Sequence, residues 1–165
     1  DISIYGLYTT LIDFPADHIN KTAELCVSES TEETTYHAIW SNQCIELWFL
    51  LHFSFMQSDL HRTSYWPKLT EMLTSLGVGE YVKNRTDMYQ ILLPYMDAAI
   101  ANAEKLDKIN KNKLPSASAP GTKVYELVKK IKTLSILKQS LPEHISFPQA
   151  FPMPYTITLS SQNPN

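Results

Sequence analysis

Residues 40–53, WSNQCIELWFLLHF, are so apolar that most of them should lie in the protein interior, although the stretch also carries an amide, a thiol, a carboxylate and an imidazole. The short apolar run YHAIW, residues 36–40, predicts a strand. Ser41 and Asn42 are common helix N-caps, and helix-forming residues follow to about Met56, so we expect a helix to start here. Its apolar residues fall on every side, which is typical of a helix packed between layers.

Asn42 and Glu46 are the polar residues of this stretch that most invite a functional interpretation. They are four residues apart, so on a helix both side chains would face the junction with the preceding strand. Ligands and ions tend to bind at such junctions in open α/β sheets. A pairing of Glu46 with a buried basic side chain or a backbone amide explains that carboxylate equally well. His52 is better explained as a core residue with a hydrogen bond, and Cys44 as a small apolar residue.

The rest of the chain predicts an α/β protein with a small, mainly parallel sheet flanked by helices and a helix-rich C-terminal half. Residues 2–12 predict a strand and residues 16–30 a helix, so that with strand 36–40 they form a strand–helix–strand unit whose strands we expect to be parallel. The other predicted elements are a helix from Trp66 to Gly77, a longer one from Thr86 or Asp87 with a kink at Pro94, a flexible connection over residues 110–121, and a last helix capped by Thr122.

The predicted domain organisation is a single domain over residues 1–138, followed by a proline-rich, extended tail over residues 139–165. Two cysteines and the lack of an opening signal sequence favour the cytoplasm. No uninterrupted apolar stretch reaches the roughly 18 residues that a membrane helix needs, so we expect no membrane partner.

Charge is distributed unevenly along the chain. Residues 1–60 hold nine acidic residues and one lysine, whereas residues 105–138 hold nine lysines and two acidic residues. A solvated helix surface explains the scattered lysines better than a phosphate-binding patch does. Thr122 and Lys123 could nevertheless bind an anion at the start of the last helix, and Lys83 could reach a nucleic-acid backbone.

The stretch SNQCIELWFLLHF, residues 41–53, is similar to the signature of the RloB-like family, Ser-Asn-x-Cys/Ala-x-Glu-Leu-Trp-x-Leu-Leu-His-Phe. Residues 81–83 resemble a Tyr-x-Lys element of the family, and residues 87–89, DMY, open a helical segment that ends in AIANAEKLD. PGTKVYELV, residues 120–128, fits the family pattern Pro-x-Thr-x-Val-x-x-Leu-Val. The resemblance covers about residues 13–131.

This resemblance implies a bacterial protein of phage-defence or restriction-associated loci, often encoded beside an ABC-type AAA ATPase that would be its partner. It also implies a fold similar to Toprim domains. Toprim nucleases bind Mg²⁺ through a glutamate on an early strand and an Asp-x-Asp pair after a later strand. Two carboxylate-bound cations stabilise both the attacking and the leaving oxygen of a phosphodiester.

The sequence departs from this family pattern in its acidic residues. Family members carry an Asp-rich element where this chain has TLIDFP, so Thr10 and Ile12 replace two carboxylates and only Asp13 remains. The upstream glutamate strand is not part of the sequence, which indicates either a fragment or a degenerate member. Asp13 and Glu46, with Asp17, are the candidates for a reduced catalytic Mg²⁺ site, although we expect this chain alone to be inactive. The alternative is a non-catalytic module that docks the partner ATPase.

Overall fold

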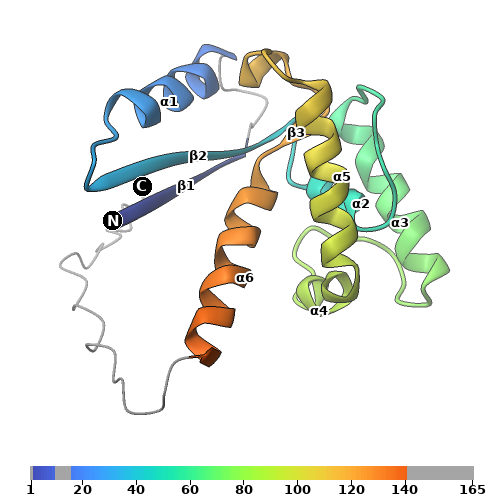
Figure 1. Cartoon of the computed structure of the whole chain (residues 1–165). Helices are drawn as coiled ribbons and strands as arrows, with labels where there is room; N and C mark the ends of the chain where they lie inside the picture. The colour runs from blue at the N-terminus through green and yellow to red at the C-terminus, as the bar shows by residue number, and fades with distance from the viewer. Residues whose placement is uncertain (1, 10–15, 141–165) are drawn as a thin grey trace, which may run out of the picture.

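The strand–helix–strand unit predicted for the start of the chain is present in the computed structural model, which describes residues 2–9 and 16–140 (Figure 1). β1 (Ile2–Thr9) and β2 (Thr34–Asn42) are parallel, in a register that runs from the pair Ile2/Thr34 to the pair Thr9/Ser41. α1 (Ala16–Ser28) connects them and packs against β2. Parallel strands need such a crossover, because the chain must return to the end of the sheet at which the first strand began.

The sheet is completed by β3 (Gly121–Thr122), which pairs with the last two residues of β2 in antiparallel orientation. The strand order is β1-β2-β3. The predicted α/β class and the small size of the sheet are confirmed, but the sheet is mixed because its third strand runs against the other two. β3 is so short that its pairing with β2 ends at Ser41; Lys123 N donates to Trp40 O just before it, and no other described strand pairs with this edge of β2.

The C-terminal half is helical, as predicted. The helices that follow β2 are α2 (Glu46–Leu51) and α3 (Tyr65–Ser75), and in the C-terminal half α4 (Met88–Leu92), α5 (Met96–Ile109) and α6 (Val124–Ser140). A 3₁₀ turn at Leu93–Tyr95 separates α4 from α5 where Pro94 predicts a kink. Gly77 follows α3 with a positive φ of 75°, the conformation that favours glycine after a helix. No helix within residues 16–140 is both long and apolar enough to cross a membrane.

α2 lies at the centre of the main hydrophobic core, where it packs against α3 and α5. Its apolar side chains point in several directions, which agrees with a helix packed between layers. The fully buried members of this core are Ile39, Leu47, Leu50, Leu51, Tyr65, Leu69, Ala99 and Ala103.

Ser41 and Asn42 do not cap α2, so this prediction is wrong. Both residues belong to β2, and α2 starts only at Glu46 and ends at Leu51. The side chains make other hydrogen bonds instead: Ser41 Oγ donates to Cys44 O at 2.8 Å, and Asn42 Nδ2 donates to two carbonyl oxygens of residues 115 and 116, each at 3.1 Å. The two long-range hydrogen bonds satisfy the side-chain amide of Asn42, so this side chain is not available to cap a helix.

The segment between α5 and α6, predicted to be a flexible connection, is packed against the rest of the chain. Asn110 and Ser118 are buried. Asn110 Nδ2 donates to Pro120 O at 2.8 Å. Ser116 exchanges hydrogen bonds with the Asn20 side chain of α1, at 2.9 and 3.0 Å. The serine side chains and the proline carbonyl groups of this segment therefore make hydrogen bonds that hold it in place, and it is not a flexible connection.

His52 is a core residue, as the sequence predicts. It is only 2% exposed, and its Nδ1 donates to Trp48 O at 2.9 Å. Its Nε2 has no hydrogen-bond partner among the described residues. The imidazole also contacts the Trp48 ring edge to face, with 4.9 Å between the ring centroids. Burial lowers the pKa of His52, because a charged ring would lose its hydration.

We expect the protein to lose stability as the pH falls below about 6.5, where the unfolded chain protonates His52 but the folded chain does not. The contribution of neutral His52 to the free energy of unfolding is fully present above that pH. Between this pH and the lower pKa of His52 in the folded protein, up to about 1.4 kcal/mol is lost per pH unit. Urea unfolding of the wild-type protein and of His52→Gln between about pH 7.5 and about pH 5 tests this. The variant should lose less stability on acidification; equal losses would exclude His52 as the cause.

Candidate functional site

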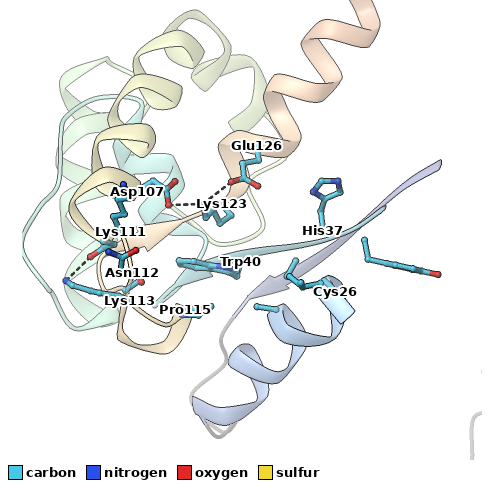
Figure 2. Close-up of a pocket in the computed structure, with 16 residues that line it drawn as sticks. Cys26, His37, Trp40, Asp107, Lys111, Asn112, Lys113, Pro115, Lys123 and Glu126 are labelled. Atoms are coloured by element: carbon cyan, nitrogen blue, oxygen red, sulfur yellow. Dashed lines mark hydrogen bonds and ion pairs between the residues drawn. The ribbon is translucent and has the colours of Figure 1, made fainter. Parts of the chain in front are cut away.

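A cleft of about 480 Å³ lies beside β2, along the part of the strand with which β3 does not pair (Figure 2). His37 and Trp40 of β2 form one wall, and α1 contributes Cys26. The opposite wall comes from the end of α5, the turn that follows it and the start of α6. The cleft exists because β3 pairs with only the last two residues of β2, which leaves room along the earlier part of the strand.

Lys123 forms an ion-pair cluster at one wall of the cleft. Its Nζ lies 2.8 Å from Asp107 Oδ1 and 2.9 Å from Glu126 Oε1 (Figure 2). Tyr125 OH donates to Asp107 Oδ2 at 2.9 Å. Burial acts to lower the pKa of Lys123, but the hydrogen bonds to the two carboxylates outweigh it and the pKa is raised. Lys123 is therefore charged, and its charge is already balanced inside the protein.

Lys111 and Lys113 line the same cleft from the turn after α5. Both side chains are exposed. Lys113 Nζ donates to Asn110 Oδ1 at 3.0 Å, and the Lys111 side chain makes no hydrogen bond or ion pair with another described residue. These two ammonium groups, unlike that of Lys123, are not neutralised by a carboxylate among the described residues and can bind an external anion.

A second hollow of about 460 Å³ lies next to the first and shares His37 and Glu126 with it. Lys129 and Lys130 of α6 line this second hollow. Lys129 pairs with Glu104 at 2.6 Å, whereas Lys130 is exposed and has no ion pair with another described residue. We call the two hollows together the basic groove; its lysines are Lys111, Lys113, Lys123, Lys129 and Lys130, and its carboxylates are Asp107 and Glu126.

Glu46 lies outside the basic groove, in the helical core. It is only 4% exposed, and its Oε1 accepts hydrogen bonds from Tyr81 OH at 3.0 Å and from Trp66 Nε1 at 3.2 Å. Burial, together with the hydrogen bond and charge of Glu46, raises the pKa of the Cys44 thiol to about 12. Burial, and then the charge and the hydrogen bond of Glu46, also raise the pKa of Tyr81. The carboxylate is thus surrounded by protonated donors.

Asn42 ends β2 and Glu46 begins α2, so both lie at the predicted junction, but their side chains share no hydrogen-bond partner among the described residues. Both side chains are buried, but Asn42 binds the turn before β3, whereas Glu46 binds α3 and the loop after it. Asp13, the other predicted catalytic and metal-binding residue, lies outside the described residues. Among the described residues, no group of three or more histidine, cysteine or acidic side chains could hold a metal ion.

The other predicted binding residues lie in different surroundings. Thr122 is buried, and its Oγ1 accepts a hydrogen bond from Val124 N at 3.3 Å. The amides of Lys123 and Glu126 also donate to main-chain carbonyl oxygens, so the start of α6 has few free amides for an anion. Lys83 is exposed in the loop between α3 and α4, and it does not line the basic groove.

His37, Lys111 and Lys113 are groove residues that the sequence did not single out. The excess of lysines over residues 105–138 was the available signal. It pointed to a basic surface without showing that β2 would face these lysines, because that contact depends on the packing of residues 110–120.

One comparison with known proteins identifies a family for the chain. A search of curated proteins found no match, and a search of solved structures found none either. The family model described as RloB-like protein matches residues 12–131. This range includes α1, β2 and every lysine of the basic groove. Because this match covers most of the length of the chain, the chain belongs to the RloB-like protein family.

Proposed function

We propose that this chain binds the phosphate backbone of nucleic acid in the basic groove, as a cytoplasmic component of a bacterial phage-defence or restriction-associated locus. The observation that carries the proposal is the distribution of uncompensated lysines along an elongated groove. Lys111 and Lys113 lie at one end and Lys130 at the other, with His37 between them. Cations spaced along a groove suit a ligand with several phosphates better than a small anion.

The residues of the basic groove indicate that binding should depend little on the base sequence of the nucleic acid. Trp40 is 7% exposed, so its ring offers little surface on which a base could stack. Asp107 and Glu126 would repel phosphates, but both are held by Lys123, which reduces their effect. Lysines contact the backbone rather than base edges in this arrangement, and backbone contacts carry no sequence information.

A Toprim-like Mg²⁺ site that uses Glu46 does not fit its surroundings. The carboxylate is buried, its Oε1 already accepts hydrogen bonds from Trp66 and Tyr81, and among the described residues no group of three or more histidine, cysteine or acidic side chains could hold a metal ion with it. We therefore place no catalytic step at Glu46 and propose binding without cleavage for this chain. The ABC-type AAA ATPase is kept as a proposed partner on the family resemblance alone.

We expect a fluorescently labelled single-stranded oligonucleotide to bind with an affinity that falls steeply with salt, with a log–log slope of roughly 2 to 3 for three or four phosphate contacts. Fluorescence anisotropy at several salt concentrations measures this slope. An oligomer of the same bases on an uncharged backbone is the matched control and should not bind. Affinity that does not change with salt, or equal affinity for the uncharged oligomer, would contradict backbone binding.

A further inference from the structure

The basic groove contains an exposed aromatic side chain in addition to its lysines. Tyr36 of β2 lines the cleft and is 38% exposed. Its main chain is fixed to the end of α1, because Tyr36 N donates to Ser30 Oγ at 2.9 Å and Ser30 Oγ donates to Cys26 O at 2.6 Å. The Tyr36 side chain makes no hydrogen bond or aromatic ring contact with another described residue. Part of its ring is therefore free to contact a ligand in the groove.

The wall of the cleft around Tyr36 is apolar. Successive side chains of a strand point to opposite faces, so Tyr36, Ala38 and Trp40 lie on the same face of β2, and all three line the cleft. Ala38 is the smallest of the three and leaves space between the two aromatic rings. Val27 of α1, which is 79% exposed, lines the cleft from the other side. A ligand that suits the groove therefore combines an apolar surface with anions, as the bases and phosphates of a nucleic acid do.

The groove also passes from one face of the sheet to the other. Figure 2 shows Cys26 of α1 on one side of β2 and Glu126 of α6 on the other, and both line the cleft. His37 points to the face opposite Tyr36, and it lines both hollows. A ligand that reaches from the lysines after α5 to Lys130 must therefore bend around the edge of β2. Duplex DNA stays nearly straight over such lengths, since its persistence length is about 50 nm, whereas a single strand can follow the bend.

We propose that the ligand of the basic groove is single-stranded nucleic acid, and that Tyr36 selects it by stacking on a base. This inference rests on the phosphate-backbone binding that we propose for the groove, and it adds the form of the nucleic acid and the residue that recognises it. A single strand exposes the faces of its bases, whereas a duplex keeps them stacked inside. Stacking on an aromatic side chain tolerates every base, so it agrees with binding that depends little on base sequence.

Two labelled oligomers test the stacking with the full wild-type chain. One is a single-stranded deoxyoligonucleotide, and the other has the same sugar-phosphate backbone and length but no bases. By fluorescence anisotropy, we expect the affinity to be about tenfold or more higher for the oligomer with bases. The slopes of log affinity against log salt should be equal, because the phosphate contacts are the same. An unlabelled duplex of the same sequence should compete at least about tenfold less strongly than the unlabelled single strand.

Substitutions at position 36 assign the preference to the tyrosine ring. Tyr36→Ala should bind the oligomers with and without bases equally, with the salt slope of the wild type. Tyr36→Phe and Tyr36→Trp keep an aromatic ring and should stay within about twofold of the wild-type affinity or exceed it. Tyr89→Ala is the matched control, because Tyr89 is 61% exposed and lies outside the groove. It should bind like the wild type.

Three results would overturn this inference while phosphate binding stands. They are equal wild-type affinity for the oligomers with and without bases, a duplex that competes as well as the single strand, and a preference for bases that Tyr36→Ala retains. A different result would overturn the proposed function together with this inference: none of the oligomers binds with an affinity that depends on salt.

Discussion

Reversing two charges in the basic groove, Lys111→Glu together with Lys113→Glu, is expected to weaken oligonucleotide binding by about a hundredfold. Both ammonium groups are exposed, and neither is paired with a described carboxylate, so each can contact a phosphate in the wild-type protein. The variant replaces two attractions by two repulsions. The slope of log affinity against log salt should also fall by roughly 1.5, since each lost phosphate contact on a single strand removes about 0.7.

The matched control for this experiment is Lys83→Glu. Lys83 is an exposed lysine of the same protein that lies outside the groove, so its reversal changes the net charge without changing the proposed site. We expect it to reduce affinity by no more than about twofold through the general field of the protein. A loss of log affinity per reversed charge that is equal for Lys83→Glu and for the groove variant would show that binding follows net charge rather than the groove.

The sequence was a good guide to elements whose signals are local. The break at Pro94 and the end of α3 near Gly77 follow from the backbone preferences of single residues. The prediction at Asn42 failed because its local capping preference competed with partners far along the chain. Its amide binds carbonyl groups 73 and 74 residues later, and a single sequence gives no sign of such contacts.

The candidate site was harder to predict for the same reason. The basic groove joins His37 to lysines that follow it by more than seventy residues, and each of these lysines looks like an ordinary surface residue in the sequence. Glu46 was easier, because a carboxylate within an apolar run requires a partner. The sequence could not identify which partner, and the structure supplies neutral donors, Trp66 and Tyr81, instead of the expected basic group or backbone amide.

Glu46 is expected to be a structural residue, so Glu46→Gln should lower the free energy of unfolding by roughly 1 to 3 kcal/mol. The side chain is buried, and it accepts hydrogen bonds from Tyr81 OH at 3.0 Å and from Trp66 Nε1 at 3.2 Å. Hydrogen bonds to a charged acceptor are stronger than those to an amide oxygen, which is the reason for the loss. Glu46→Ala should cost more, about 3 kcal/mol or above, because it removes the acceptor of both donors and leaves a cavity at a buried position.

Urea unfolding measures these losses, and Glu71→Gln on the exposed surface of α3 is the matched control, with an expected change within about 0.5 kcal/mol. A double-mutant cycle with Tyr81→Phe then assigns the effect, since removal of the tyrosine hydroxyl should cost less when Glu46 is already glutamine. Calorimetric titration of Mg²⁺ separates this role from metal binding. Stability equal to the wild type in Glu46→Gln, together with Mg²⁺ binding that the substitution abolishes, would return Glu46 to the list of metal ligands.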